Sequence, residues 1–87
     1  MFIELEIKNE LGLHARVASK VTRTLKTFQA SVIATKGGKT YDFKNVTAVM
    51  LYNGRFGETV MFEITGEDEE AAAEGLKLLF ETKFGEN

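Results

Sequence analysis

Two hydrophobic periodicities alternate along this chain of 87 residues, and their order constrains the fold more than any other feature. Apolar side chains recur at every second position near residues 3–7 and 60–64, which predicts half-buried strands there. Two further strands are predicted near residues 31–35 and 40–44, on either side of a Gly-Gly pair. Apolar side chains recur at spacings of three and four in three other segments, which predicts helices near residues 15–28, 46–53 and 67–84. The predicted order is therefore β, α, β, β, short α, β, α.

This order favours an α+β fold. Four strands alternating with three helices in so short a chain favour one antiparallel four-stranded sheet with all three helices on one face. The predicted fold is an open-faced two-layer sandwich of topology βαββαβα, whose other face meets water. No linker or repeat divides the sequence, so we expect residues 1–87 to form a single domain.

Turn and cap residues support these boundaries. The glycines at positions 37–38 predict a tight hairpin between the second and third strands. Asn45 predicts the N-cap of the short helix, and residues 53–54, Asn-Gly, predict its end. The acids at positions 67–70 suit the positive N-terminal end of the last helix, and Gly85 predicts where that helix stops.

The long helices are amphipathic. The predicted buried face of the first helix consists of Ala15, Ala18, Val21, Leu25 and Phe28. Basic side chains gather on its opposite, solvent-facing side: Arg16, Lys20, Arg23 and Lys26. The predicted buried stripe of the last helix consists of Leu76, Leu79 and Phe80.

Composition excludes several kinds of site. Without cysteine the chain has no disulfide, thiolate zinc site or cysteine nucleophile, and its one histidine excludes a multi-histidine metal site, so we expect no metal or cofactor. No apolar run reaches membrane-spanning length, and residues 1–10 carry acids where an export signal is basic. We therefore expect a cytosolic protein without a membrane partner.

Charge is distributed unevenly along the chain. Residues 11–41 hold six basic side chains and no acid, whereas residues 58–87 hold nine acids against two lysines. This asymmetry predicts a basic face that could meet an acidic protein or a phosphate. The net charge of −2 and the absence of paired aromatic residues on a basic strand argue against nucleic-acid binding.

His14 is the candidate reactive residue, because it lies between a glycine-containing turn and the start of the basic helix. The backbone amides of Ala15, Arg16 and Val17 would be unpaired at this helix N-terminus, where they stabilise a phosphate together with the Arg16 side chain. Positive surroundings also favour a neutral imidazole with a nitrogen free for nucleophilic attack. The residues alone leave open that His14 is an ordinary cap or surface residue.

The sequence nevertheless resembles a known family over nearly its whole length. The segment from Gly12 to Arg16, Gly-Leu-His-Ala-Arg, followed by Ala18, resembles the active-site motif of the histidine-containing phosphocarrier protein (HPr) family of the sugar phosphotransferase system. Further matches are Gly38-Lys39, Lys44, Val49-Met50-Leu51 and Gly66-Glu67-Asp68.

The resemblance implies a carrier and not a catalyst. His14 would accept a phosphoryl group from phosphorylated enzyme I and pass it to an enzyme IIA protein, with Arg16 holding the phosphate. Family members dock through the first and the short helix, which implies partner contacts by Lys20, Val46, Thr47 and Met50. Apolar residues at helical spacing are more often core, so Val46 and Met50 have that alternative. We expect Lys20 and Thr47 to lie on the surface.

The chain departs from the family pattern at two positions. Val17 stands where a proline usually follows the active-site arginine, which restores a backbone donor and frees φ. Asn45 stands where many relatives carry a serine phosphorylated by a regulatory kinase, so it keeps the capping role but offers no hydroxyl. These departures motivate an alternative, an HPr-like regulatory module that binds partners without carrying phosphate. In either case we expect a monomer.

Overall fold

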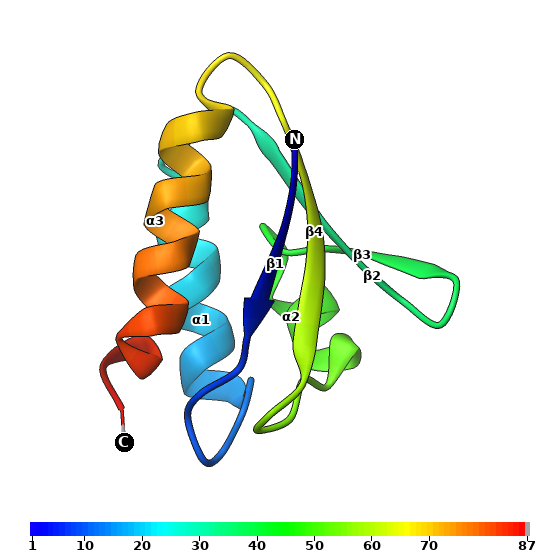
Figure 1. Cartoon of the computed structure of the whole chain (residues 1–87), viewed down its shortest axis with the longest axis vertical. Helices are drawn as coiled ribbons and strands as arrows, with labels where there is room; N and C mark the ends of the chain where they lie inside the picture. Colours follow the sequence, from blue (N-terminus) through cyan, green and yellow to red (C-terminus); the bar gives the residue numbers. More distant parts are fainter. Residues whose placement is uncertain (87) are drawn as a thin grey trace.

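The computed structural model describes residues 1–86 and contains the predicted elements in the predicted order (Figure 1). The strands are β1 (Phe2–Glu6), β2 (Ser31–Lys36), β3 (Lys39–Asp42) and β4 (Thr59–Thr65). The helices are α1 (Ala15–Leu25), α2 (Val46–Tyr52) and α3 (Glu69–Glu81), followed by a single 3₁₀ turn, η1 (Lys83–Gly85). Among these residues no helix is both long and apolar enough to cross a membrane.

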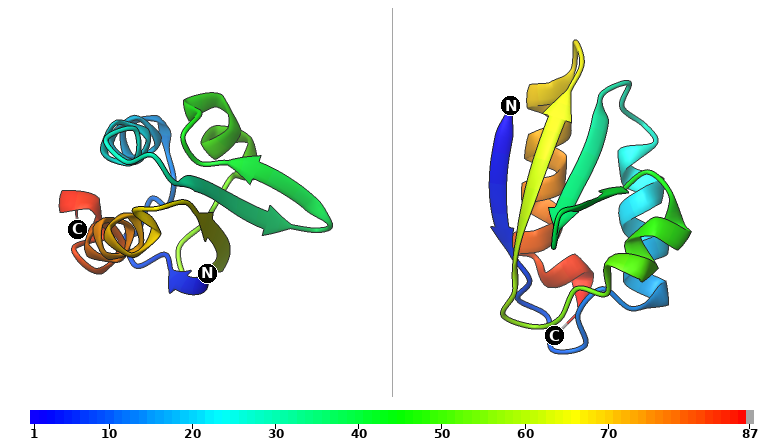
Figure 2. Two further views of the ribbon diagram at one scale, coloured as in Figure 1. Left: turned by 90° about the horizontal axis from the view of Figure 1, so that it is seen from above. Right: turned by 90° about the vertical axis from the view of Figure 1, so that its right-hand side faces the viewer.

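The strands form one antiparallel sheet in the order β1-β4-β2-β3. In its register Leu5 faces Val60 and Ala34 faces Phe62. Figure 2 shows the three helices on the same side of the sheet, with the other face uncovered. The predicted open-faced sandwich is confirmed.

The core lies between the sheet and the helices, and it draws on both ends of the chain. Buried residues alternate along β4, where Val60, Phe62 and Ile64 are fully buried. Four aromatic rings form a series of edge-to-face pairs across this layer: Phe43, Phe62, Phe80 and Phe84. Each such pair contributes about 0.5–1.5 kcal/mol beyond its buried area. Phe84 therefore ties the C-terminal turn into the core.

The buried face of α1 differs from the predicted one. Ala15 is exposed, Phe28 lies beyond the helix and is half-buried, and Val17 is buried at the helix start. The periodicity placed Ala15 on the inner stripe, but the helix begins at this residue, whose side chain has no preceding turn to pack against. Val17 instead anchors the first turn of α1.

Two further details differ from the prediction. Strand β3 ends two residues earlier, at Asp42, and Leu79 of α3 is half-buried and not part of a fully buried stripe.

Helix α2 begins and ends as predicted. The Asn45 side chain accepts a hydrogen bond from the Ala48 amide at 3.1 Å, and Asn53 adopts the left-handed conformation that closes the helix.

The acidic cluster at the start of α3 does more than the prediction assigned to it. The Asp68 carboxylate makes no capping bond to its own helix; it accepts hydrogen bonds from the amides of Gln29 and Ala30, both at 2.8 Å. Lys44 donates to the carbonyl oxygens of Phe28 and Ala30 in the same turn. Asp68 therefore fixes the α1–β2 connection, a role that sequence-local reasoning cannot see.

Asp68 predicts a pH-dependent stability. The hydrogen bonds from Gln29 and Ala30, helped by Lys44, hold the pKa of this carboxyl below its ordinary value of about 4, against the opposing effect of burial. Because the folded pKa is the lower one, this contribution to stability is complete above about pH 4 and is lost as pH falls through the folded pKa.

We expect the Asp68→Asn variant to be less stable than the parent at pH 7 and closer to it at pH 3. Urea unfolding at both pH values measures the difference. The neighbouring, exposed Glu67 provides the control Glu67→Gln. An equal gap between parent and Asp68→Asn at the two pH values would contradict the assignment.

The end of α3 also differs from the prediction. Helix α3 stops at Glu81, with Thr82 as its C-cap, and not at Gly85. In the following turn η1, Lys83 and Phe84 both have φ of 56°, a left-handed conformation that costs a non-glycine residue about 1–2 kcal/mol. This reversal directs the Phe84 ring into the core and carries the chain back towards α1.

Candidate functional site

Three chain segments meet at one end of the molecule, at the bottom of Figure 1: the β1–α1 loop, the α2–β4 loop and the C-terminal turn. Backbone hydrogen bonds join the first two. The Leu13 amide donates to the Gly54 carbonyl oxygen and the Gly57 amide to that of Ile7, at 2.9 and 2.8 Å. The sheet and α2 thereby fix the loop that precedes His14.

Two glycines allow this close approach. Gly12 has φ of +69°, and a Cβ atom there would lie 2.4 Å from the Gly54 carbonyl oxygen. A Cβ atom on Gly54 would lie 2.6 Å from the side chains of Ile7 and Leu13. Leu13 itself is buried, so the residue before His14 is anchored in the core while His14 emerges at the surface.

His14 occupies the N-cap position of α1 in an extended conformation. Its side chain makes no capping hydrogen bond within the described chain, and its carbonyl oxygen accepts the first helical bond, from Ala18. The amides of Ala15, Arg16 and Val17 precede this bond, so they lie at the positive end of the helix as predicted. Among these three residues, Ala15 and Arg16 have exposed side chains.

The imidazole of His14 is 29% exposed and contacts a carboxylate from the other end of the chain. Its Nε2 atom lies 2.8 and 2.9 Å from the two oxygens of Glu86. Hydrogen bonding from His14 lowers the pKa of the Glu86 carboxyl, burial opposes this, and Asn9 and Arg16 also lower the pKa. An ionised carboxylate only accepts hydrogen bonds, so Nε2 carries a hydrogen here. In the neutral ring, Nδ1 is then the nitrogen with a free lone pair.

Sequence reasoning missed Glu86. It lies 72 residues from His14, and no local pattern connects the two. The predicted site included only the positive surroundings of the imidazole, whereas the structure adds a negative group in direct contact with it. The left-handed residues of η1, which bring Glu86 to this position, also have no signal in the sequence.

The residues expected to dock partners fall into two groups. Val46 and Met50 are 44% and 43% exposed, so they do not belong to the core, and Thr47 is exposed as predicted. Lys20 differs from the prediction: it is half-buried and its Nζ donates to the Phe84 carbonyl oxygen at 2.7 Å. Other large apolar side chains are exposed on the adjoining loops and α2 but were not predicted as docking residues: Leu11, Leu51 and Phe56.

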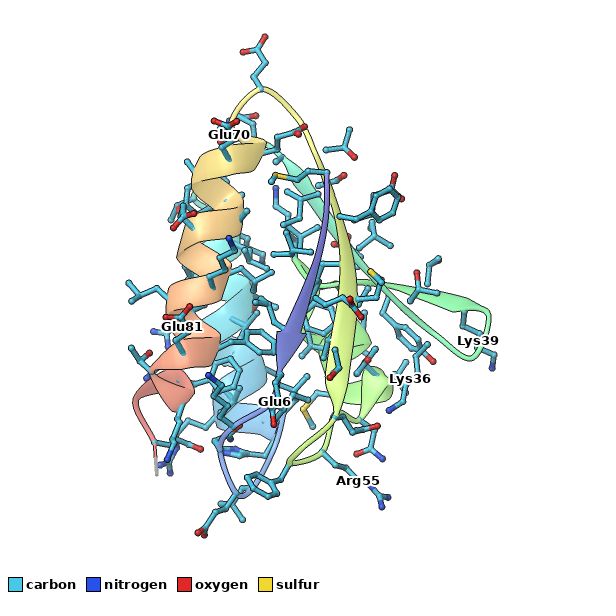
Figure 3. All side chains as sticks on the ribbon, in the orientation of Figure 1. Glu6, Lys36, Lys39, Arg55, Glu70 and Glu81 are labelled. Carbon is cyan, nitrogen blue, oxygen red and sulfur yellow. The ribbon has the colours of Figure 1, made fainter. Side chains whose placement is uncertain are left out.

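The acidic cluster at the start of α3, residues 67–70, lies far from His14. Figure 3 shows Glu70 at the end of α3 that lies opposite the C-terminus. The 13 residues of α3 separate the two ends by about 20 Å, beyond the Debye length at physiological salt. The acids at positions 67–70 therefore oppose little of the positive potential around the start of α1. No cluster of three potential metal ligands occurs among residues 1–86.

Fold and site together define a class of small open-faced α+β proteins that present one histidine at the start of a surface helix. A family model described as the PTS HPr component phosphorylation site matches residues 3–82. The chain belongs to the HPr family of phosphocarrier proteins.

Individual relatives agree with this assignment. The phosphocarrier protein HPr of Xylella fastidiosa (strain Temecula1) is 37% identical over 84 residues, which cover 97% of this chain and 94% of the relative. A crystal structure of HPr from Thermoanaerobacter tengcongensis superimposes with a TM-score of 0.93 at 34% identity, covering 100% of this chain and 98% of that one. A structure described as an HPr dimer from the same organism gives a TM-score of 0.78 at 36% identity and covers 94% of each chain.

Proposed function

We propose that this protein is a phosphoryl carrier of the phosphoenolpyruvate-dependent sugar phosphotransferase system, with His14 as the phosphorylated residue. His14 takes the group from phosphorylated enzyme I and delivers it to an enzyme IIA protein. The single observation that carries this proposal is the half-exposed imidazole at the start of α1, whose Nδ1 is not engaged by Glu86.

The proposed transfer needs one nucleophile and one leaving group. The lone pair of Nδ1 forms the new N–P bond, while the N–P bond of the donor breaks and its electron pair returns to the donor nitrogen. The reverse roles apply when the group passes to enzyme IIA. The protein is thus a substrate of two larger proteins and acts as no catalyst by itself.

The phosphoryl group would be held at the start of α1. Up to three backbone amides, those of Ala15, Arg16 and Val17, are available to its oxygens at the positive end of the helix dipole. The exposed Arg16 guanidinium adds a mobile cation with several donors. Val17 keeps its side chain in the core and offers the backbone donor that a proline would lack.

The docking surface is proposed to surround His14. Helix α2 contributes two exposed apolar side chains, Val46 and Met50, and one exposed polar side chain, Thr47. The basic side of α1 would complement acidic residues at the edge of a partner's binding surface. Lys20 contributes to that side of α1 only through its aliphatic side-chain carbons, because its ammonium group donates to the Phe84 carbonyl oxygen.

Incubation with phosphoenolpyruvate, magnesium and enzyme I tests the function directly. We expect the mass of one phosphoryl group to be added, in a linkage that is labile in acid and stable in base. If no enzyme I labels the chain and a pull-down yields a stable complex with a partner enzyme or regulator, the alternative of a regulatory binding module replaces the proposal.

Asn45 has no hydroxyl group to phosphorylate. We therefore expect a serine kinase to leave this position unmodified.

A second prediction concerns Arg16. The Arg16→Ala variant should keep its fold, because the side chain is exposed. It should accept phosphate about 10- to 100-fold more slowly, since a charge-assisted hydrogen bond of about 1.5–3 kcal/mol is lost. Arg23 is exposed on the same helix two turns further on, so Arg23→Ala is the matched control. Equal rates for the two variants, measured by rapid quench, would remove Arg16 from the mechanism.

The cellular location and the oligomeric state are predicted from the sequence. The cytosolic location follows from composition and from the proposed function. A monomer is expected, although two structural relatives are described as dimers. Light scattering at micromolar and millimolar concentrations distinguishes the two states.

A further inference from the structure

We propose that Glu86 is a positioning residue for phosphoryl transfer: it fixes the His14 ring with Nδ1 free and stabilises the charge that the ring acquires. This inference rests on the proposed function, since it assigns a role in the same reaction. It concerns a residue that contacts the histidine and neither the phosphate nor a partner.

The contact itself is specific. Nε2 approaches both carboxylate oxygens, at 2.8 and 2.9 Å, so the ring is centred on the carboxylate. The Asn9 side chain orients that carboxylate: its Nδ2 donates to Glu86 Oε1 at 3.3 Å and to the Gly12 carbonyl oxygen at 2.8 Å. Asn9 is fully buried, and a buried polar side chain held in this way has little freedom to turn.

The segment that carries Glu86 is held in place from three directions. The Phe84 ring is buried and packs edge-on against Phe80, with 4.8 Å between ring centres. Lys20 binds the Phe84 carbonyl oxygen, and the Glu86 amide donates to the Lys83 carbonyl oxygen at 2.8 Å. These contacts offset the left-handed backbone at Lys83 and Phe84. Strained backbone that its surroundings over-determine is typical of functional sites.

The chemistry of the transfer explains what a carboxylate at Nε2 would do. When the neutral Nδ1 attacks phosphorus, the ring donates a lone pair and keeps its Nε2 hydrogen, so it gains one positive charge. Glu86 faces that hydrogen and stabilises the charge, while Nδ1 is not engaged by the carboxylate. The other charged group that acts on Glu86 is Arg16, which balances part of the carboxylate's charge near the incoming phosphate. A carboxylate that orients a histidine tautomer and stabilises imidazolium is known from hydrolytic triads.

Two substitutions separate the parts of this role. Glu86→Ala removes both acceptor and charge, and Glu86→Gln keeps the length and one acceptor oxygen without the charge. Glu81→Gln is the matched control, because Glu81 is an exposed acid near the end of α3 (Figure 3). A ¹H–¹⁵N spectrum of each variant establishes that the fold is retained.

We expect the Glu86→Ala variant to accept phosphate from enzyme I about tenfold or more slowly at saturating concentration, with KM unchanged. Groups that orient metal-bound histidines through the other ring nitrogen affect activity by about 10- to 100-fold, and Glu86 holds His14 in the same way. Glu86→Gln should lie between Glu86→Ala and the parent. The Nε2 proton of His14 should be visible by NMR in the parent, protected from exchange, and lost in Glu86→Ala. If Glu86 only stabilised the C-terminal turn, the Nε2 proton signal would persist in a Glu86→Ala variant that keeps its fold.

The outcomes distinguish the inference from the proposed function. If the parent is phosphorylated and Glu86→Ala matches Glu81→Gln in rate, Glu86 has no positioning role. If the parent shows no protected Nε2 proton, the ring is not held as described. If the parent is not phosphorylated at all, the proposed function is wrong. The role inferred for Glu86 is then wrong as well, even if the Nε2 proton signal shows that Glu86 contacts His14.

Discussion

Replacing His14 with alanine is expected to abolish phosphorylation completely. The chain offers no second imidazole and no thiol to take its place, because His14 is the only histidine and cysteine is absent. The ring contributes little to the core, since it is 29% exposed and its polar contact is with Glu86 at the surface. We therefore expect loss of all label from enzyme I with little change in the free energy of unfolding.

The measurement is mass spectrometry of the chain after incubation with phosphoenolpyruvate and enzyme I, alongside thermal unfolding. Thr40→Ala provides a control at an exposed hydroxyl on β3, outside the proposed docking surface, and it should label like the parent. Persistent acid-labile phosphate on the folded His14→Ala variant would show that another residue accepts the group. Loss of label together with loss of the fold would show that His14 is structural.

Most of the fold could be predicted because it depends on local patterns. The strands near Ile3 and Phe62 alternate in burial as their sequences alternate, and the Asn45 cap needs only the residue three positions on. The start of α1 beside His14 was predicted on the same basis. These features are fixed by neighbours within a few residues, which a pattern can report.

The features that were missed depend on residues far apart in the sequence. Asp68 caps a turn 38 and 39 positions away, Lys20 binds an oxygen 64 positions away, and Glu86 reaches His14 across 72. From its sequence neighbours alone, Asp68 is an acid at a helix start, Lys20 an exposed lysine and Glu86 a residue of the C-terminal tail. Asp68 takes its role from the packing of α3 against the α1–β2 connection, and Lys20 and Glu86 take theirs from the packing of the C-terminal turn against α1. The half of the site that surrounds Nε2 therefore could not be predicted.

The loop that carries His14 depends on close backbone contact between Gly12 and Gly54. A methyl group on Gly12 would lie 2.4 Å from the Gly54 carbonyl oxygen and 3.1 Å from the Arg55 Cα atom. Both are backbone atoms tied to α2, so neither can move without shifting the loop. The left-handed φ of +69° adds a conformational cost of its own.

Gly12→Ala is therefore expected to destabilise the fold by about 4 kcal/mol or more, among the largest effects of single substitutions, and to slow phosphorylation of the remaining folded protein. Gly37 supplies the control, because its φ is +57° but nothing lies within 4 Å of a Cβ atom there. Gly37→Ala carries only the conformational cost of about 1–2 kcal/mol and should be phosphorylated at the parent rate. Urea unfolding and the transfer rate of both variants test this, and equal losses of stability would mean that the contact with Gly54 does not hold the His14 loop.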